Sequence, residues 1–254
     1  MKSVELNFWQ SALTEDMHVH STFSDGLHSP AENIRQAEQL GLQRFCCVDH
    51  VRRDTTWLGE FVAEVNRLKA TSPLQIFSGI ETKLLNQAGD LDMPDNLAGV
   101  DFVYVADHQF PLGETTFTPS QIKEMLAENK ITSAKLFTAL VEATANSLDR
   151  HPRIVIAHLF SILPKIGLSE EQVPEELIAE LAAKASAAGA QLEVDERWKC
   201  PSARTVEIFM QAGVPIRFST DSHRKEKIGL YKYNLALSEQ LSVGLLAYQA
   251  SCAA

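Results

Sequence analysis

Short apolar segments alternate with longer segments of helical pattern along most of the chain. The apolar segments predict strands over residues 16–20, 44–50, 75–85, 100–108, 154–158, 191–195 and 214–221. Strands that alternate with helices favour parallel β/α units. The predicted fold class is therefore α/β, and about seven units in 254 residues fit a TIM-like barrel with one strand fewer than the usual eight. We expect one domain over residues 1–254.

The segments between the predicted strands carry helix start and stop signals. Ser29-Pro30-Ala31-Glu32 and Thr118-Pro119-Ser120-Gln121 both combine a capping hydroxyl, a proline at the first helical position and a Glu or Gln at the third. Gly41, Gly189 and Gly213 each stand between a helical run and a strand, as C-terminal stops do. A doubly wound open sheet would also satisfy the alternation, but its Gly-x-Gly-x-x-Gly turn does not follow the first strand.

The charge balance of the chain is acidic. It has 23 Lys and Arg against 33 Asp and Glu, a formal net charge of −10. Nucleic-acid binders usually show a basic footprint, so we expect no nucleic-acid partner, although a local basic patch remains compatible with this balance. No run of about 18 apolar residues predicts a membrane span, and the first residues lack the apolar core of a signal peptide. The expected location is the cytoplasm, and the sequence does not indicate an oligomeric state.

Residues suited to metal binding gather at the ends of the predicted strands. Six of the 8 histidines and two acidic residues stand there: His18, His20, His50, His108, His158, His223, Glu81 and Asp221. In a β/α barrel the carboxyl ends of all strands converge on one face. A lone histidine in a strand is usually an ordinary polar residue. The His-x-His pair on the first strand is more specific, because residues two apart face the same side. As a set, these residues predict a multinuclear metal site.

The types of ligand restrict the metal. Imidazole and carboxylate groups without thiolate favour zinc, manganese or iron, and the chain has no Cys-x-x-Cys pair. So many ligands exceed the needs of one ion, so we predict two or three divalent transition metals. Such a cluster lowers the pKa of bound water and neutralises phosphoryl oxygens. The pattern therefore fits the hydrolysis of an anionic ester.

Ordered motifs on these strands resemble those of the PHP (polymerase and histidinol phosphatase) superfamily, over residues 16 to about 229. The matching residues are Asp16-Met17-His18-Val19-His20-Ser21 with Ser24-Asp25-Gly26 and Pro30, Val48-Asp49-His50, Ser78-Gly79-Ile80-Glu81, Asp101-Phe102-Val103 leading to His108, Ile156-Ala157-His158, and Ser219-Thr220-Asp221-Ser222-His223 with Gly229. Each motif alone is weak, but the ordered set is specific.

The resemblance implies a distorted barrel of seven β/α units and a trinuclear metal site. It places His18, His20, Glu81 and Asp221 around one metal, and these four are the expected catalytic residues. It places Glu81, His108 and His158 around a second metal, and Asp25, His50 and His223 around a third. From its position alone, Asp25 could be a simple turn residue before Gly26. Only the resemblance favours it as a ligand.

Some positions depart from the family pattern. Many relatives have proline after the histidine of the fifth strand, where this chain has Leu159 and Phe160. Relatives often carry asparagine after the sixth strand, where this chain has Asp195 and then Arg197. Asp107 stands where an apolar residue is common. These departures bear on the substrate more than on the metals.

The predicted activity is that of a metal-dependent phosphoesterase, which uses metal-activated water on a small phosphomonoester such as histidinol phosphate. Arg197 and Arg224 are expected to bind the phosphate by charge-assisted bonds, with a surface salt bridge as the ordinary alternative. Three alternatives stay open. They are a carbon–nitrogen hydrolase of the amidohydrolase kind, a phosphodiesterase or nuclease of the same superfamily, and a metal-binding module without catalysis.

Overall fold

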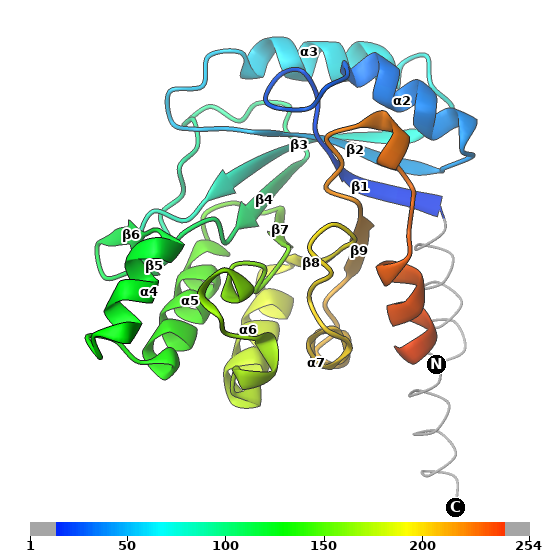
Figure 1. Cartoon of the computed structure of the whole chain (residues 1–254). Helices are drawn as coiled ribbons and strands as arrows, with labels where there is room; N and C mark the ends of the chain where they lie inside the picture. Colours follow the sequence, from blue (N-terminus) through cyan, green and yellow to red (C-terminus); the bar gives the residue numbers. More distant parts are fainter. Residues whose placement is uncertain (1–13, 242–254) are drawn as a thin grey trace, which may run out of the picture.

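The computed structural model of the protein describes residues 14–241, and its centre is a parallel sheet of seven strands. In spatial order they are β1 (Glu15–Val19), β2 (Arg44–His50), β3 (Gln75–Lys83), β4 (Phe102–Ala106), β7 (Ile154–Ala157), β8 (Gln191–Asp195) and β9 (Ile216–Ser219). The first and last strands meet, because Val19 forms a parallel bridge with Ser222 and the His20 amide donates to the Ser222 carbonyl at 2.8 Å. The sheet is a nearly closed barrel (Figure 1), which confirms the predicted fold class.

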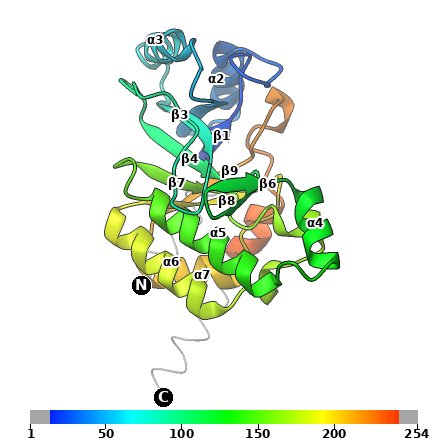
Figure 2. The same ribbon diagram turned by 90° about the vertical axis from the view of Figure 1, so that its left-hand side faces the viewer.

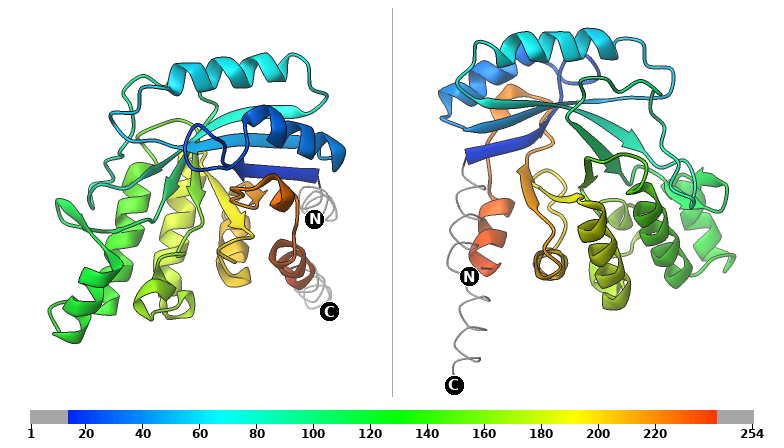
Figure 3. Two further views of the ribbon diagram at one scale, coloured as in Figure 1. Left: turned by 45° about the horizontal axis from the view of Figure 1, so that its top comes forward. Right: turned by 180° about the vertical axis from the view of Figure 1, so that it is seen from behind.

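Helices cover the outside of this sheet. Helices α2 (Pro30–Gln39) and α3 (Leu58–Lys69) lie over the first strands (Figure 3). Helices α5 (Ser133–Ser147), α6 (Glu175–Ala188) and α7 (Ala203–Gln211) lie side by side along the other half (Figure 2). Between β4 and α5 the chain forms a hairpin and a further helix, β5 (Phe110–Leu112), β6 (Thr115–Phe117) and α4 (Pro119–Ala127). Residues 233–241 are also helical.

The predicted helix signals act as expected. The side-chain oxygen of Ser29 accepts a hydrogen bond from the Glu32 amide, and the Glu32 carboxylate accepts one from the Ser29 amide. The same reciprocal pair joins Thr118 and Gln121 at the start of α4. Gly189 ends α6 with a φ of 67°, a left-handed conformation that glycine adopts without steric cost. Local sequence therefore defines the helix ends that turn the chain back toward the sheet.

Several strands end earlier than the sequence predicts. The strand expected over 214–221 is confined to Ile216–Ser219, and that expected over 100–108 to Phe102–Ala106. The prediction extended too far because the chain leaves the sheet just before its polar residues. Asp221 and His158 have φ values of 45° and 31°, which no strand contains. Residues with positive φ cluster at functional sites, so this strain lies where the predicted ligands are.

The barrel interior is filled below the mouth by apolar groups around Tyr104. This side chain is fully buried, and its hydroxyl donates to the Met17 carbonyl. Its ring centroid lies 4.7 Å from that of His18, so Tyr104 closes the barrel beneath the first predicted ligand. Gly79 lies against the same ring. A Cβ added there would stand 2.9 Å from both Tyr104 Cε2 and Val48 Cγ2.

We therefore expect Gly79→Ala to destabilise the protein by about 1–3 kcal/mol, since overpacking a filled core forces side chains to shift. Urea unfolding of the variant and the wild type measures this difference. Gly59→Ala is the matched control, because nothing lies within 4 Å of the added Cβ and the residue is helical. Alanine should stabilise that position by about 0.5–1 kcal/mol. A Gly79→Ala variant as stable as the wild type would show that the interior is not tightly packed.

Candidate metal centre

The barrel mouth brings together all nine residues that the sequence predicts as metal ligands. His18 lies on β1, His50 at the end of β2 and Glu81 on β3, while the others follow strand ends: His20, Asp25, His108, His158, Asp221 and His223. His18, His20, Glu81, His158 and Asp221 are buried, His50, His108 and His223 are partly buried, and Asp25 is exposed. The site therefore has a buried floor and an open rim.

Glu81 occupies the middle of the arrangement, with imidazoles on both sides of its carboxylate. Oε1 lies 3.0 Å from Nε2 of both His108 and His158. Oε2 lies 2.9 Å from His50 Nδ1, and it is 3.2 Å and 3.3 Å from the Nε2 atoms of His20 and His18. A carboxylate whose two oxygens face separate sets of imidazoles has the arrangement expected of a bridge between two cations.

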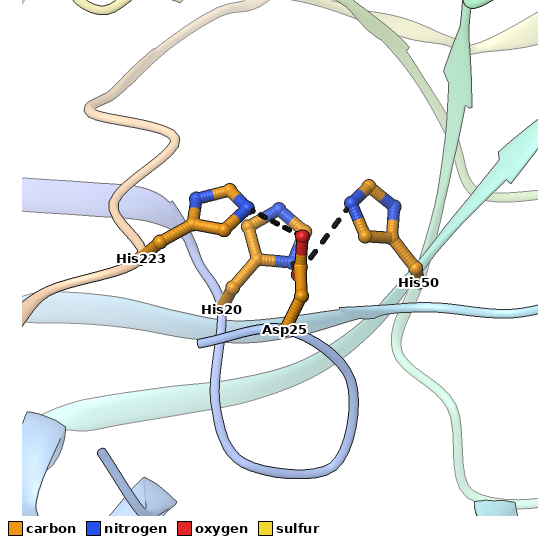
Figure 4. Close-up of side chains that lie close together, drawn as sticks. All are labelled: His20, Asp25, His50 and His223. Atoms are coloured by element: carbon orange, nitrogen blue, oxygen red, sulfur yellow. Dashed lines mark hydrogen bonds and ion pairs between the residues drawn. The ribbon is translucent and has the colours of Figure 1, made fainter. Parts of the chain in front are cut away.

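A second set of side chains surrounds Asp25 at the open rim (Figure 4). Its Oδ2 lies 3.1 Å from His223 Nε2, and its Oδ1 lies 3.7 Å from both His50 Nε2 and His20 Nδ1. His20 also contacts the buried side, where its Nε2 is 3.1 Å from Asp221 Oδ1. His20 and His50 therefore stand between the rim and the floor, each with one ring nitrogen toward either side.

The donor set fits metal ions better than hydrogen bonding. Within residues 14–241, Nδ1 of His20 and of His50, Oε2 of Glu81 and Oδ1 of Asp221 are buried without a hydrogen-bond partner. Such orphaned atoms are rare in native proteins, and a bound metal ion would satisfy them. The Nε2 atoms of His18 and His20 are 3.1 Å apart. Two nitrogens bound tetrahedrally to one zinc ion lie about 3.3 Å apart, so this pair is spaced for chelation.

The pKa shifts of the clustered side chains also favour the binding of cations. Burial raises the pKa of Glu81, but His18, His108 and His158 outweigh it and hold this pKa well below its ordinary value. Burial lowers the pKa of His20, but Asp221 and Glu81 outweigh it and raise this pKa to about 9. Glu81 thus stays charged, while His18, His20 and His158, whose pKa values are lowered by burial but raised overall by neighbouring carboxylates, hold protons against it. A divalent cation would replace those protons.

Sequence reasoning did not single out Glu193, which lies on β8 beneath the centre. This residue is fully buried. Its Oε1 accepts from Nδ1 of His18 at 2.8 Å, and its Oε2 accepts from the His158 amide at 2.7 Å. A carboxylate on the far nitrogen fixes the tautomer and orientation of a ligating imidazole. Glu193 is therefore a positioning residue for two strand ends at once.

His158 has a similar support on its other side. The Ser161 hydroxyl donates to Asp107 Oδ1 at 2.6 Å, and both groups contact His158 Nδ1, at 3.0 Å and 3.3 Å. Asp107 is the position where the chain departs from the usual apolar residue. Its carboxylate contacts the His158 ring directly and through Ser161, which orients that ring.

The loop that carries Asp25 is fixed by Asp49. The Asp49 carboxylate accepts from the amides of Ser21 and Ser24 at 2.9 Å and 3.1 Å and from both serine hydroxyls at 2.6 Å. Gly26 closes the turn against His20, where a Cβ would come within 2.5 Å of backbone atoms. The motif that resembled a ligand loop therefore has a defined conformation, although Asp25 itself is exposed.

The two predicted phosphate-binding arginines lie on the same side of the mouth. Arg197 Nη1 is 3.1 Å from Asp221 Oδ2 and 2.9 Å from His223 Nδ1. Arg224 is exposed, and it lines the same hollow as Arg197 and His223. Trp198, which the sequence did not indicate, donates its indole N–H to Asp221 Oδ2 at 2.8 Å. Asp221 is thus held from one side by Arg197 and Trp198 and faces His20 on the other.

We expect Glu193→Gln to weaken metal binding by about 10- to 100-fold, the usual effect of losing an outer carboxylate partner of a ligating histidine. Titration of the metal-free variant with zinc, followed by calorimetry, measures the change. Glu180→Gln, an exposed acid on α6, is the control and should bind as the wild type does. Equal zinc affinity in Glu193→Gln and the wild type would remove Glu193 from this role.

Comparison with known proteins places this geometry in a family. The family model described as the PHP domain matches residues 16–196. The fold is also similar to that of histidinol phosphate phosphatase from Lactococcus lactis, solved with zinc, L-histidinol and phosphate. That match has a TM-score of 0.61 and 17% identity, and it covers 90% of this chain and 92% of the other. At this identity the likeness concerns the fold. No curated protein sequence matches the chain.

Two further structures are more distant. A protein from Bifidobacterium adolescentis, assigned as a metal-dependent phosphoesterase, gives a TM-score of 0.37 at 15% identity, over 85% of this chain and 90% of the other. A D-hydantoinase gives a TM-score of 0.40 at 14% identity, over 82% of this chain and 46% of the other.

Proposed function

The chain belongs to the PHP domain family, and from this membership we propose that it is a metal-dependent phosphatase that hydrolyses a small phosphomonoester. One observation carries the proposal. The buried carboxylate of Glu81 has imidazoles 2.9–3.3 Å from both of its oxygens, and one of those oxygens has no hydrogen-bond partner within the described chain. The side chains around Glu81 would hold more than one cation, and such cations would bind a phosphoryl group and water close together.

Three groups of side chains in the mouth have ligand atoms close enough to hold one ion each: His20 with Asp25, His50 and His223; His18 with His20 and Asp221; and His50 with Glu81 and His108. His158 adds a ring nitrogen 3.0 Å from Glu81 Oε1. We propose that these residues bind two or three divalent ions of zinc, manganese or iron. Bound there, the ions would supply the Lewis acidity that activates water and neutralises phosphoryl oxygens.

The remaining residues of the mouth would bind the phosphate or orient the metal ligands. Arg197 and Arg224 border the centre on the side of His223, where they can donate to phosphate oxygens. Glu193 and Asp107 hold the imidazoles of His18 and His158 at fixed angles. Trp198 and Arg197 keep Asp221 turned toward His20. Each of these residues either positions a reacting group or stabilises the charge of the phosphate. Enzymes of phosphoryl transfer gain most of their rate from these two effects.

The proposed substrate is a small molecule rather than a polymer. The acidic net charge of −10 offers no general attraction for nucleic acid. Within residues 14–241, no helix is long and apolar enough to cross a membrane.

A substrate panel on metal-reconstituted protein tests the proposal. It contains small phosphomonoesters including histidinol phosphate, a phosphodiester, single-stranded DNA, and a cyclic imide such as hydantoin. Release of phosphate from monoesters supports the proposal. Cleavage of the imide alone would replace it with a carbon–nitrogen hydrolase, and cleavage of the diester or DNA alone with a phosphodiesterase. A protein that binds metal but cleaves nothing would be a metal-binding module.

A further inference from the structure

A hollow beside the metal centre is lined by more cations than one phosphate requires. We call it the basic pocket, and the residues that border it include Arg197, Arg224, Lys227, Lys232, Asp221 and His223. Four of its ten lining residues are Lys or Arg and two are acids, in a chain whose acids outnumber its Lys and Arg by 33 to 23. Because Asp221 and His223 belong to the centre, the basic pocket opens directly from the place where the phosphate would react.

The acids of the basic pocket have other partners and form no ion pair with its lysines in the described chain. Asp221 is held by His20, Arg197 and Trp198. Glu196, which also borders the hollow, accepts from the backbone amides of residues 233 and 234, where it caps the helix that follows. Within residues 14–241, no carboxylate oxygen lies within 4.0 Å of the side-chain nitrogens of Arg224, Lys227 or Lys232. These cations therefore line the hollow without an ion-pair partner within 4.0 Å in the described chain.

The loop that presents them is anchored, so their placement is part of the fold. It follows β9 and is coloured orange in Figure 1. The Gly229 amide donates to Asp16 Oδ2 at 3.0 Å, and the Tyr231 hydroxyl donates to the Glu15 carbonyl. Ile228 is buried at 1% exposure. With Ile228, Gly229 and Tyr231 fixed, the exposed residues Lys227 and Lys232 project on either side of this anchor.

We infer that the basic pocket binds a second anionic group, a carboxylate or a phosphate, on the alcohol portion of the substrate. The inference rests on the proposed function and narrows its substrate class. Arg197 and Arg224 adjoin the centre and suit the reacting phosphate, whereas Lys227 and Lys232 lie farther along the loop and suit the second anion. The side chain of Leu230, 53% exposed between them, borders the hollow and offers an apolar surface for the connecting carbons.

A basic pocket that prefers a second anion is poorly suited to histidinol phosphate. Histidinol carries an ammonium group near neutral pH, and like charges across a binding site are destabilising. A phosphomonoester with a carboxylate or second phosphate gains ion pairs in the same place. We therefore expect kcat/KM to be highest for esters of anionic alcohols, lower for esters of neutral alcohols and lowest for esters of cationic alcohols.

Matched substrates test the inference in the metal-reconstituted protein. They are 3-hydroxypropyl phosphate, 3-phosphooxypropanoate and propane-1,3-diyl bisphosphate, with histidinol phosphate as the cationic member. We expect kcat/KM to be higher for one or both anionic members, and the better of the two identifies the group as carboxylate or phosphate. Lys227→Met with Lys232→Met should reduce that preference about tenfold, since each exposed ion pair contributes a few-fold. The hydroxypropyl ester, which carries no second anion, should lose less of its kcat/KM than the anionic esters lose.

Lys225→Met is the control within the same loop. Its side chain does not border the basic pocket, and its Nζ lies 4.0 Å from Glu32 Oε1. It should leave the order of substrates unchanged. Equal kcat/KM for the neutral and anionic esters, or a preference for histidinol phosphate, would overturn the inference while leaving phosphatase activity intact.

Binding measurements test this inference independently of the proposed function, because they do not require catalysis. If no ester is cleaved, the proposed function fails, and calorimetric titration with the same compounds still tests the pocket. Tighter binding of the anionic compounds that disappears in the double lysine variant supports a second anion site. Equal binding of the neutral and anionic compounds contradicts it.

Discussion

Glu81→Gln should abolish phosphate release while the protein stays folded. The amide keeps the size of the side chain but removes the negative charge that faces imidazoles at 2.9–3.3 Å on both oxygens. Loss of an outer partner of a ligand costs up to about a hundredfold, so loss of a shared central carboxylate should exceed a hundredfold in kcat/KM. Phosphate release by the metal-reconstituted variant measures the loss, and circular dichroism checks the fold.

Glu60→Gln provides the comparison, because this acid is exposed on α3, outside the barrel mouth. It should release phosphate at the wild-type rate. Elemental analysis of Glu81→Gln should show fewer bound ions than the wild type under the same loading. Wild-type activity in Glu81→Gln would exclude this carboxylate from the centre and leave the proposed function without its main support.

The barrel was predictable because parallel strands covered on both faces appear in sequence as continuous apolar runs. The strand Arg44–His50 is an example, with five consecutive buried residues. The β5–β6 hairpin was not predictable by the same reasoning. Phe110–Leu112 and Thr115–Phe117 are three residues each, too short to show a period, and Pro111 argues against a strand except at an edge.

The cluster of candidate ligands was predictable because its histidines lie where the fold places the ends of its strands. Each lies near, at or just beyond the carboxyl end of a strand, so the predicted strands were enough to bring them together. Glu193 had no such signal. A lone acid within a short strand resembles a solvent-facing residue, and its partners His18 and His158 are 175 and 35 residues away in sequence. Its role depends on which face of β8 turns inward, which only the closed barrel establishes.

Removal of metal should eliminate hydrolysis and lower the melting temperature, and zinc or manganese should restore both. An ion at about 100 times its Kd stabilises the folded protein by about 2.7 kcal/mol. For a chain of this size each kcal/mol corresponds to about 2–4 °C, so the expected shift is about 5–10 °C. Scanning calorimetry of chelator-treated and reloaded protein measures it. Elemental analysis should give two or three ions per chain after reloading, and fewer than one would exclude the multinuclear centre.

The pH dependence of loading gives a test that does not rely on activity. Burial lowers the pKa of His20, and Asp221 and Glu81 outweigh burial to raise it to about 9, so the metal-free ring holds its proton at neutral pH. An imidazole must be neutral to bind a metal, so loading releases this proton and apparent affinity rises with pH until about 9. Zinc titrations in two buffers of different ionisation enthalpy count the released protons. Affinity that stays constant between pH 6 and about 9 would mean that no proton of His20 or its neighbours is displaced, and that the ions bind elsewhere.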